Sequence, residues 1–271
     1  MVSFVAWLST PALFSAVFAP SLLPWGSAIA LNTVLAIVAW FAPKQLLTPA
    51  GLLHAWALGV LIWGSLGWRG YLVVMFYFLV GSAVTRIGMA EKESAGIAEK
   101  RSGARGPENV WGSALVGALC AVGVFLLPWI MADPVKRGSV AALLGLGYVA
   151  SFSTKLSDTC ASEVGKAYGK STFLITTLRS VPRGTEGAVS LEGTLAGMLA
   201  SIAIALVGWA VGLIDVAGIG ICVLAAFVAT NIESVIGATL QTRLPWLTNE
   251  WVNVLNTLIG AIVAIGMASL F

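Results

Sequence analysis

The chain is poor in charged residues. Only 10% of its 271 residues are Asp, Glu, Lys or Arg, whereas a soluble globular domain carries about 25%. Hydrophobic residues make up 58% of the sequence. Apolar runs approach the ~20 residues that a helix needs to cross a bilayer, and the alternating segments of ~10 residues that mark a membrane β-barrel are absent. This composition excludes a cytosolic enzyme and predicts an all-α, polytopic transmembrane bundle.

Other scarcities limit the chemistry of the chain. His54 is the single histidine, so the sequence offers no histidine cluster for zinc or iron. The three cysteines, Cys120, Cys160 and Cys222, share no metal-like spacing and are interpreted as packing residues. A GxxxxGK[ST] motif is missing, which excludes a P-loop. The formal net charge of +3 is too small to indicate a nucleic-acid partner.

Nine apolar segments are expected to span the membrane. They are Phe4–Leu22, Ser27–Ala42, Ala50–Leu66, Gly70–Arg86, Gly112–Met131, Gly138–Ser153, Val189–Leu213, Ala217–Ile232 and Trp251–Leu270. The first lacks a basic n-region and is therefore interpreted as a spanning helix and not as a cleaved signal. No repeat or linker divides the chain, which predicts a single membrane domain over residues 1–271.

The basic residues predict which loops face the cytoplasm. Nine spans alternate the loops between two sides, and twelve of the 15 basic residues then fall on one side. The other side receives only Arg69, Lys136 and Arg137. Because positive residues concentrate in cytoplasmic loops, the polar loops at about 91–111, 153–188 and 233–250 are all predicted to face the cytoplasm.

The central polar stretch, residues 153–197, is the main candidate site, because polar islands in membrane proteins are costly and usually functional. It contains the carboxylates Asp158 and Glu163. Hydroxyl side chains flank them at Ser157, Thr159 and Ser162. Two carboxylates among hydroxyls suit Mg²⁺. The alternative is a helix N-terminus capped by Ser157 or Asp158, with Glu163 balancing a neighbouring lysine.

A glycine-rich turn at residues 181–190 follows this cluster and leads into an apolar helix. Such a turn exposes backbone N–H groups and the positive end of the helix dipole to an anion. Arg183 adds formal charge. The other candidate ligands in the turn are Gly184, Thr185, Gly187 and Ser190.

Two further polar segments contribute candidates. In RSGARGPEN, residues 101–109, a flexible backbone carries Arg105 and Asn109, and arginine offers paired donors to a phosphate; the alternative is a solvated charged loop. Asn231 and Glu233 follow a long apolar run near the membrane boundary. An asparagine stripe then occupies Asn249, Asn253 and Asn256, and is interpreted as interhelical contact more than as ligands.

Three motifs carry a family resemblance. They are ARGPENVWGS at 104–113, SDTCASEVG at 157–165 and VPRGTEGAVSLEGTLAG at 181–197. In this order they resemble the domain-of-unknown-function 92 family of integral membrane proteins, which includes animal transmembrane protein 19 and the phytyl-phosphate kinases of plants and cyanobacteria. The resemblance extends from about Leu46 to the C-terminus. It implies phosphorylation of phytyl phosphate to phytyl diphosphate for tocopherol and phylloquinone synthesis, with CTP or another nucleoside triphosphate as donor.

The polar residues suit such a reaction. A phosphate monoester has a second pKa near ~6, so the acceptor oxygen is already an anion and no histidine base is required. Asp158, Glu163 and Glu233 are the expected Mg²⁺ ligands. Asp158, Glu163, Lys166 and Arg183 are the expected catalytic residues. The expected binding residues for the lipid phosphate and the nucleotide are Arg105, Asn109, Lys155, Ser157, Thr159, Ser162, Gly184, Thr185, Gly187, Ser190, Asn231 and Glu233.

Other functions remain as alternatives. A transporter or flippase of a phosphorylated isoprenoid also needs cations and would show glycine-broken helices at the membrane midplane. Another CTP-linked lipid phosphotransferase is a second alternative, although the paired-aspartate motif of the CDP-alcohol type is missing. A non-catalytic assembly factor is the third. Clustering of the polar loops on one side favours an enzyme that uses a soluble nucleotide.

Overall fold

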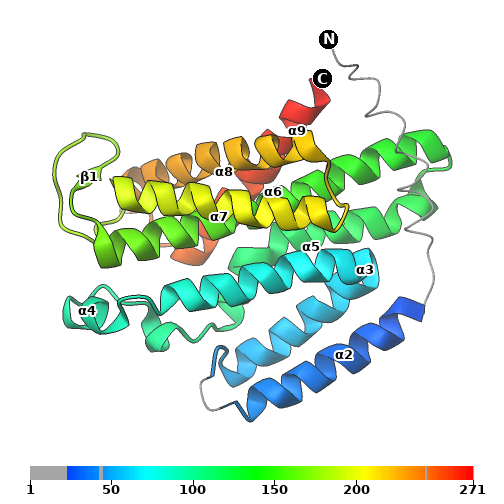
Figure 1. The fold of residues 1–271 in the computed structure, drawn as a ribbon, viewed down its shortest axis with the longest axis horizontal. Coiled ribbons are helices and arrows are strands. Elements are labelled where there is room, and N and C mark those ends of the chain that lie inside the picture. The colour runs from blue at the N-terminus through cyan, green and yellow to red at the C-terminus, as the bar shows by residue number, and fades with distance from the viewer. Residues whose placement is uncertain (1–22, 43–44, 242, 271) are drawn as a thin grey trace.

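The computed structural model describes residues 23–42, 45–241 and 243–270, and these residues form a bundle of helices with one small hairpin (Figure 1). The helices are α2 (Leu23–Trp40), α3 (Pro49–Thr85), α4 (Met89–Ser94), α5 (Pro107–Ile130), α6 (Pro134–Tyr168), α7 (Leu191–Ala210), α8 (Val216–Ile236) and α9 (Asn249–Ser269). Short turns of other helix types lie at η2 (Lys100–Gly103) and η3 (Gly237–Gln241). Strands β1 (Thr172–Leu174) and β2 (Ala188–Ser190) form the hairpin. The predicted helical membrane class is confirmed.

Fewer helices are long and apolar enough to cross a bilayer than the nine expected. Within the described ranges there are six: α3, α5, α6, α7, α9 and the continuous stretch Val216–Gln241. The apolar helix Pro24–Trp40 is shorter than this length. The expected span Phe4–Leu22 lies outside the described residues.

Helix α3 contains a sharp break that divides it into two legs. Gly67 has φ 64° and ψ −159°, a backbone conformation that L side chains disfavour and glycine permits. Figure 1 shows the two legs folding back on each other at this point. Each leg, 49–66 and 68–85, is about 27 Å long at ~1.5 Å per residue. The legs correspond to the expected spans Ala50–Leu66 and Gly70–Arg86.

Helix α6 is the centre of the bundle and packs against α3, α5, α7, α8 and α9. Tyr148, Val149 and Phe152 are fully buried in its apolar half. The expected loop at 153–188 is wrong in its first part, because the helix continues to Tyr168. Lys155, Asp158 and Glu163 of this part are buried between helices and have polar partners within α6 and on α4 and α9. They therefore do not need the solvent that a loop would provide.

Glycines bring α7 close to the polar half of α6. A Cβ at Gly193 would lie 2.5 Å from the carbonyl oxygen of Ala161, and one at Gly197 would lie 2.9 Å from that of Ser157. Either contact is too short for any larger residue. Small residues at these two positions thus allow the two helices to pack closely.

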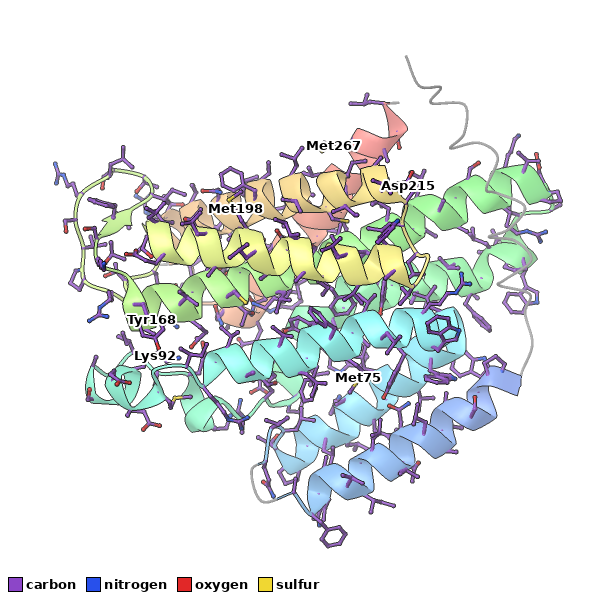
Figure 2. All side chains as sticks on the ribbon, in the orientation of Figure 1. Met75, Lys92, Tyr168, Met198, Asp215 and Met267 are labelled. Atoms are coloured by element: carbon purple, nitrogen blue, oxygen red, sulfur yellow. The ribbon has the colours of Figure 1, made fainter. Side chains whose placement is uncertain are left out.

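The polar segments gather at one end of the bundle, which we call the motif end and define by residues 86–106, 169–190, 237–241 and 243–248. Leu47, in the turn before α3, forms a bridge with Arg105 at this end. Figure 2 shows Lys92 and Tyr168 at the motif end and Asp215 at the opposite end. The predicted gathering of polar loops on one face is confirmed. The β1–β2 hairpin, with Thr172 paired to Ser190, is an addition to the expected all-α architecture.

Candidate functional site

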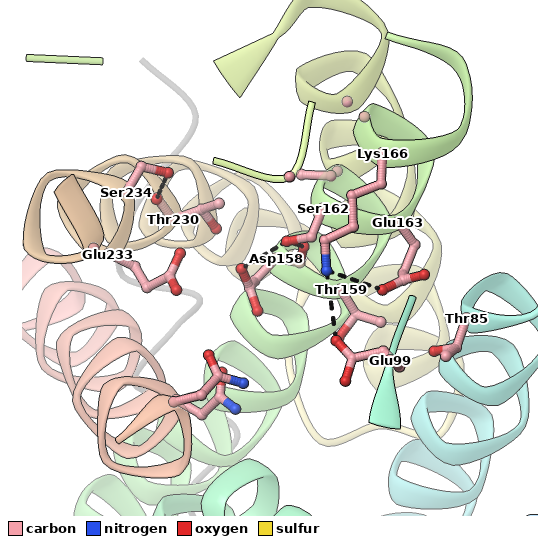
Figure 3. A pocket seen from close by; sticks show the side chains of 18 of the residues that line it. Thr85, Glu99, Asp158, Thr159, Ser162, Glu163, Lys166, Thr230, Glu233 and Ser234 are labelled. Atoms are coloured by element: carbon pink, nitrogen blue, oxygen red, sulfur yellow. Dashed lines mark hydrogen bonds and ion pairs between the residues drawn. The ribbon is translucent and has the colours of Figure 1, made fainter. Parts of the chain in front are cut away.

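A cavity of about 590 Å³ lies at the motif end (Figure 3). Its walls come from α3, α5, α6, α7, α8 and α9, and residues 96–105 and 184–190 contribute the remaining lining. Pockets for small molecules usually measure about 300–1,000 Å³, so this cavity has the size of a ligand site.

The structure brings nearly all the predicted site residues to this cavity. Its lining includes Arg105, Asn109, Lys155, Ser157, Asp158, Thr159, Ser162, Glu163, Lys166, Gly184, Thr185, Gly187, Ser190, Asn231 and Glu233. These residues come from four separate segments of the chain. The sequence motifs therefore form one spatial site.

Arg183 is the predicted site residue that lies elsewhere. It lines a separate hollow formed by residues 167–173 and 180–183. Its Nη1 donates to the carbonyl oxygen of Ala167 at 2.9 Å and to that of Lys166 at 3.5 Å. A cation at the C-terminus of a helix satisfies free carbonyls and the dipole. The structure thus gives Arg183 a capping role on α6, and the predicted position of its charge in the site is wrong.

A buried polar cluster joins α6 to α9. The Nζ of Lys155 lies 2.5 Å from Oδ2 of Asp158 and 2.7 Å from Oδ1 of Asn253. The side chains of Lys155 and Asp158 are both 9% exposed. The hydroxyl of Ser162 donates to the backbone carbonyl of Asp158, one turn earlier in α6, at 2.9 Å. Asn253 belongs to the asparagine stripe, and this bond between α6 and α9 confirms the interhelical contact expected of it while also placing it beside the site lysine.

Two carboxylates face each other across the cavity. Figure 3 shows Glu233 of α8 and Asp158 of α6 pointing toward one another. Like charges at short range are stable only with a cation or a proton between them. The ammonium group of Lys155, 2.5 Å from Oδ2 of Asp158, offsets part of this repulsion. Close by, the buried hydroxyl of Thr230 has no hydrogen-bond partner among the described residues.

The predicted three-carboxylate metal site is not assembled. Within the described part of the chain, no three His, Cys, Asp or Glu side chains are grouped so that they could hold a metal ion. Asp158 and Glu233, with the hydroxyl of Ser162, still offer the hard oxygen ligands that Mg²⁺ prefers, and this ion commonly takes one or two carboxylates plus phosphate oxygens and water. The pair therefore fits Mg²⁺, whereas Glu163 does not join it.

Glu163 instead forms ion pairs with lysines. Its Oε2 pairs with Lys92 of α4, and both side chains are almost fully buried. Lys92 also donates to the carbonyl oxygen of Thr85 at 2.8 Å. On the cavity side, Oε1 of Glu163 lies 3.7 Å from Nζ of Lys166. Glu163 thus fastens α4 to α6 and orients Lys166.

Lys92 is a residue that sequence reasoning missed. It lies in a charged segment, EKESAGIAEK, that has the composition of a solvated loop. Its partner Glu163 is 71 residues away in the chain. No local pattern distinguishes this lysine from its charged neighbours, so only the tertiary structure identifies it.

Arg105 is held firmly on the opposite wall of the cavity. Its backbone N–H donates to Leu46 and its carbonyl accepts from Thr48, both at 3.0 Å. Its Nη1 donates to the hydroxyl of Tyr77 at 2.7 Å, and the guanidinium lies 5.2 Å from the centre of the Tyr77 ring. Gly81 leaves room for it, since a Cβ there would lie 2.8 Å from Nη2. A preorganised arginine of this kind suits a phosphate.

The glycine-rich turn reaches the cavity as predicted, through the hairpin. Gly184 and Gly187 have φ values of 83° and 75°, which favour glycine. A Cβ at Gly187 would lie 2.5 Å from the carbonyl oxygen of Ser234, so glycine also permits the close approach to α8. Ser190 then caps α7 by accepting from the N–H of Gly193 at 3.1 Å.

Comparison with known proteins identifies the family. Residues 32–261 match the model of "Integral membrane protein DUF92". The chain belongs to this family of integral membrane proteins. The match confirms the resemblance carried by the three motifs, and it spans every residue that lines the cavity.

Individual DUF92 relatives cover most of the chain. An uncharacterized membrane protein of Synechocystis is 66% identical over 244 residues, which are 90% of this chain and 91% of that protein. The chloroplastic protein VTE6 of Arabidopsis thaliana is 45% identical over 245 residues, 90% of this chain and 72% of VTE6. An uncharacterized membrane protein of Methanocaldococcus jannaschii is 29% identical over 217 residues, 79% of this chain and 83% of that protein. No solved structure matches the chain.

Proposed function

We propose that this DUF92 protein is a membrane-embedded isoprenoid-phosphate kinase. The reaction is transfer of the γ-phosphoryl group of a nucleoside triphosphate to phytyl phosphate, which gives phytyl diphosphate. The observation that carries the proposal is the cavity at the motif end, where Arg105, Lys155 and Lys166 line one space with two facing carboxylates. Similarity to chloroplastic VTE6 and the family resemblance to phytyl-phosphate kinases support the substrate class.

The acceptor phosphate needs no general base from the protein. A phosphate monoester has a second pKa near ~6, so at neutral pH its oxygen is a ready nucleophile. No side chain must remove a proton. The task of the site is then to bring two anionic phosphates together and to offset their repulsion.

The cations of the cavity perform this task. The phytyl phosphate oxygen forms a bond to the γ-phosphorus, the bond from that phosphorus to the β–γ bridging oxygen breaks, and the nucleoside diphosphate leaves with the electron pair. Arg105 is preorganised by Tyr77 to bind phosphate oxygens in two-point fashion. Lys155 and Lys166 neutralise the charge that spreads over the transferred group. Positioning and electrostatics supply the catalysis.

Asp158 and Glu233 are the residues that would hold Mg²⁺. The chemistry that the ion would supply there is neutralisation of the negative charge on the nucleotide phosphates, its usual role in phosphoryl transfer. Asp158 also keeps the ammonium group of Lys155 in place at 2.5 Å. In this assignment Glu163 is a positioning residue for Lys166 and has no contact with the metal.

The site would face the cytoplasm, where soluble nucleotides are available. The bias of basic residues toward the motif-end loops supports this orientation. CTP is the donor expected from the family resemblance, and the product would serve tocopherol and phylloquinone synthesis. A flippase of a phosphorylated isoprenoid, or another CTP-linked lipid phosphotransferase, is the alternative. The flippase would need a glycine-broken helix at the binding site. The break at Gly67 is not at the site, because the two legs of α3 meet there at the end of the bundle opposite the motif end.

The test uses protein purified in detergent, phytyl phosphate, Mg²⁺ and each of ATP, CTP, GTP and UTP. Formation of phytyl diphosphate with one donor, abolished by EDTA and by Lys155→Met, supports the kinase. Arg179→Ala is the matched control, since Arg179 is exposed at the motif end and outside the cavity. No diphosphate with any donor, together with phytyl phosphate movement across proteoliposome membranes, would instead establish the flippase.

A further inference from the structure

The two sides of the cavity differ in the exposure of their lining residues. On α3, α6 and α9 the deepest lining residues are Tyr77, Lys155 and Asn253, and all three are buried within the bundle. On α7 and α8 the deepest lining residues are Met198 and Phe227, which are 38% and 44% exposed. On the side of α3, α6 and α9 the cavity lining is therefore buried, whereas on α7 and α8 it includes apolar side chains that are also exposed at the surface of the bundle.

Helices α7 and α8 pack side by side and are antiparallel: α7 runs away from the motif end and α8 runs toward it. Met198 lies seven residues after the start of α7, and Phe227 nine residues before the end of α8. At ~1.5 Å per residue, both side chains lie roughly 10–14 Å from the motif end. Figure 2 marks Met198 along this line of contact. The two exposed apolar residues thus stand at matching depth on the two sides of one seam.

Polarity changes along this seam in the same order on both helices. Nearer the motif end, the lining of α7 is Gly193 and Thr194, and the lining of α8 is Thr230 and Glu233. Beyond them the lining becomes apolar. An amphiphile with an anionic head and a hydrocarbon tail matches such a gradient, because the head would lie among cations and hydroxyls while the tail would contact apolar side chains at bilayer depth.

We infer that the seam between α7 and α8 is the lateral port through which the isoprenoid tail extends from the cavity into the bilayer, with Met198 and Phe227 as its rim. The inference rests on the proposed function for the identity of the lipid. A cavity of about 590 Å³ has the size of a site for one small molecule. The lipid head and the nucleotide phosphates occupy it, and the long tail remains in the membrane.

The port makes a prediction about chain length. Met198→Trp and Phe227→Trp add bulk at the rim and obstruct a long tail, while the tail of a short prenyl phosphate ends before it passes the rim. We expect the KM for phytyl phosphate to rise about tenfold, the scale of effect that apolar pocket contacts produce. The KM values for geranyl phosphate and for the nucleotide should stay unchanged. Leu195→Trp and Leu224→Trp are matched controls, because both leucines are exposed on the same helices and outside the cavity lining.

A binding experiment separates this inference from the kinase assignment. A prenyl phosphate with a photoreactive diazirine in its tail is bound to the wild-type protein in lipid nanodiscs, irradiated, and its adducts are mapped by mass spectrometry. Adducts on α7 and α8 around Met198 and Phe227, reduced by excess phytyl phosphate, establish the port even if the protein shows no kinase activity. Competed adducts confined to α2 or α3, or a tenfold KM change in the control variants, would overturn the port even if the kinase assay succeeds.

Discussion

The two ends of the bundle use charged residues in different ways. At the motif end, Lys92 pairs with Glu163 across 71 residues of sequence and Lys155 binds Asn253 across 98. At the opposite end, Asp133 accepts from the N–H of Val135 at 2.9 Å, and Asp215 accepts from that of Gly218 at 2.8 Å. These two aspartates are helix caps, with partners in the next turn of the same helix.

The difference separates folding chemistry from site chemistry. A cap needs only a local backbone donor and ends a helix in any protein. A long-range ion pair buried in a membrane bundle is costly to desolvate and adds little net stability compared with apolar packing. Charges of the second kind therefore indicate a function, and in this protein they surround the cavity.

The largest effect should follow loss of the preorganised arginine. Arg105→Ala should lower kcat by about 10³-fold or more, since a cation on the transferred phosphoryl group contributes about 10³–10⁵. Arg105→Lys should recover only part of this loss, because lysine lacks the paired donors. The measurement is steady-state diphosphate formation, with Arg179→Ala as the control. Wild-type kcat in Arg105→Ala would remove Arg105 from the mechanism.

The second effect concerns stability. Glu163→Gln leaves the ammonium group of Lys92 buried without its charge partner, and breaking such a pair costs about 3–5 kcal/mol of unfolding free energy. Denaturant unfolding in detergent measures the change. The double variant Lys92→Met with Glu163→Met should recover most of the loss, because it leaves no unpaired charge. A double variant as unstable as the single one would show that the pair itself is not the cause.

A moderate effect is expected at Thr230. Its hydroxyl has no partner within the described residues, so Thr230→Val should leave thermal stability unchanged. If the hydroxyl binds a substrate phosphate, its loss removes a hydrogen bond to a charged group, about 1.5–3 kcal/mol. The KM for one substrate should therefore rise roughly tenfold or more. Unchanged KM values for both substrates would exclude this contact.

The smallest effects should appear at the opposite end. Asp133→Ala and Asp215→Ala should each lower the unfolding free energy by about 1 kcal/mol, the usual contribution of an N-cap. Both kcat and KM should remain at wild-type values, because neither residue lines the cavity. Assays at equal folded fraction distinguish a loss of stability from a loss of activity. A large loss of activity in either variant would contradict the assignment of these two aspartates to helix capping alone.

Sequence reasoning succeeded where the signal is local or compositional. Apolar runs predict the helical membrane class, and the positions of the polar motifs predict that they gather at one end. It failed where a contact is long-range. The hairpin turns Arg183 back onto the end of α6, and α4 carries Lys92 to Glu163. It also treated residues 153–168 as a loop, because polar composition does not reveal that partners from α4 and α9 keep this part of α6 buried.

The most direct test compares two aspartates, one from each end. Wild-type protein, Asp158→Asn and Asp215→Asn are purified in detergent, checked for equal folding, and supplied with phytyl phosphate, Mg²⁺ and the preferred nucleoside triphosphate. We expect phytyl diphosphate from the wild type and from Asp215→Asn, and none above background from Asp158→Asn. Full activity in a folded Asp158→Asn protein would contradict the assignment of the motif-end cavity as the place where the phosphoryl group is transferred.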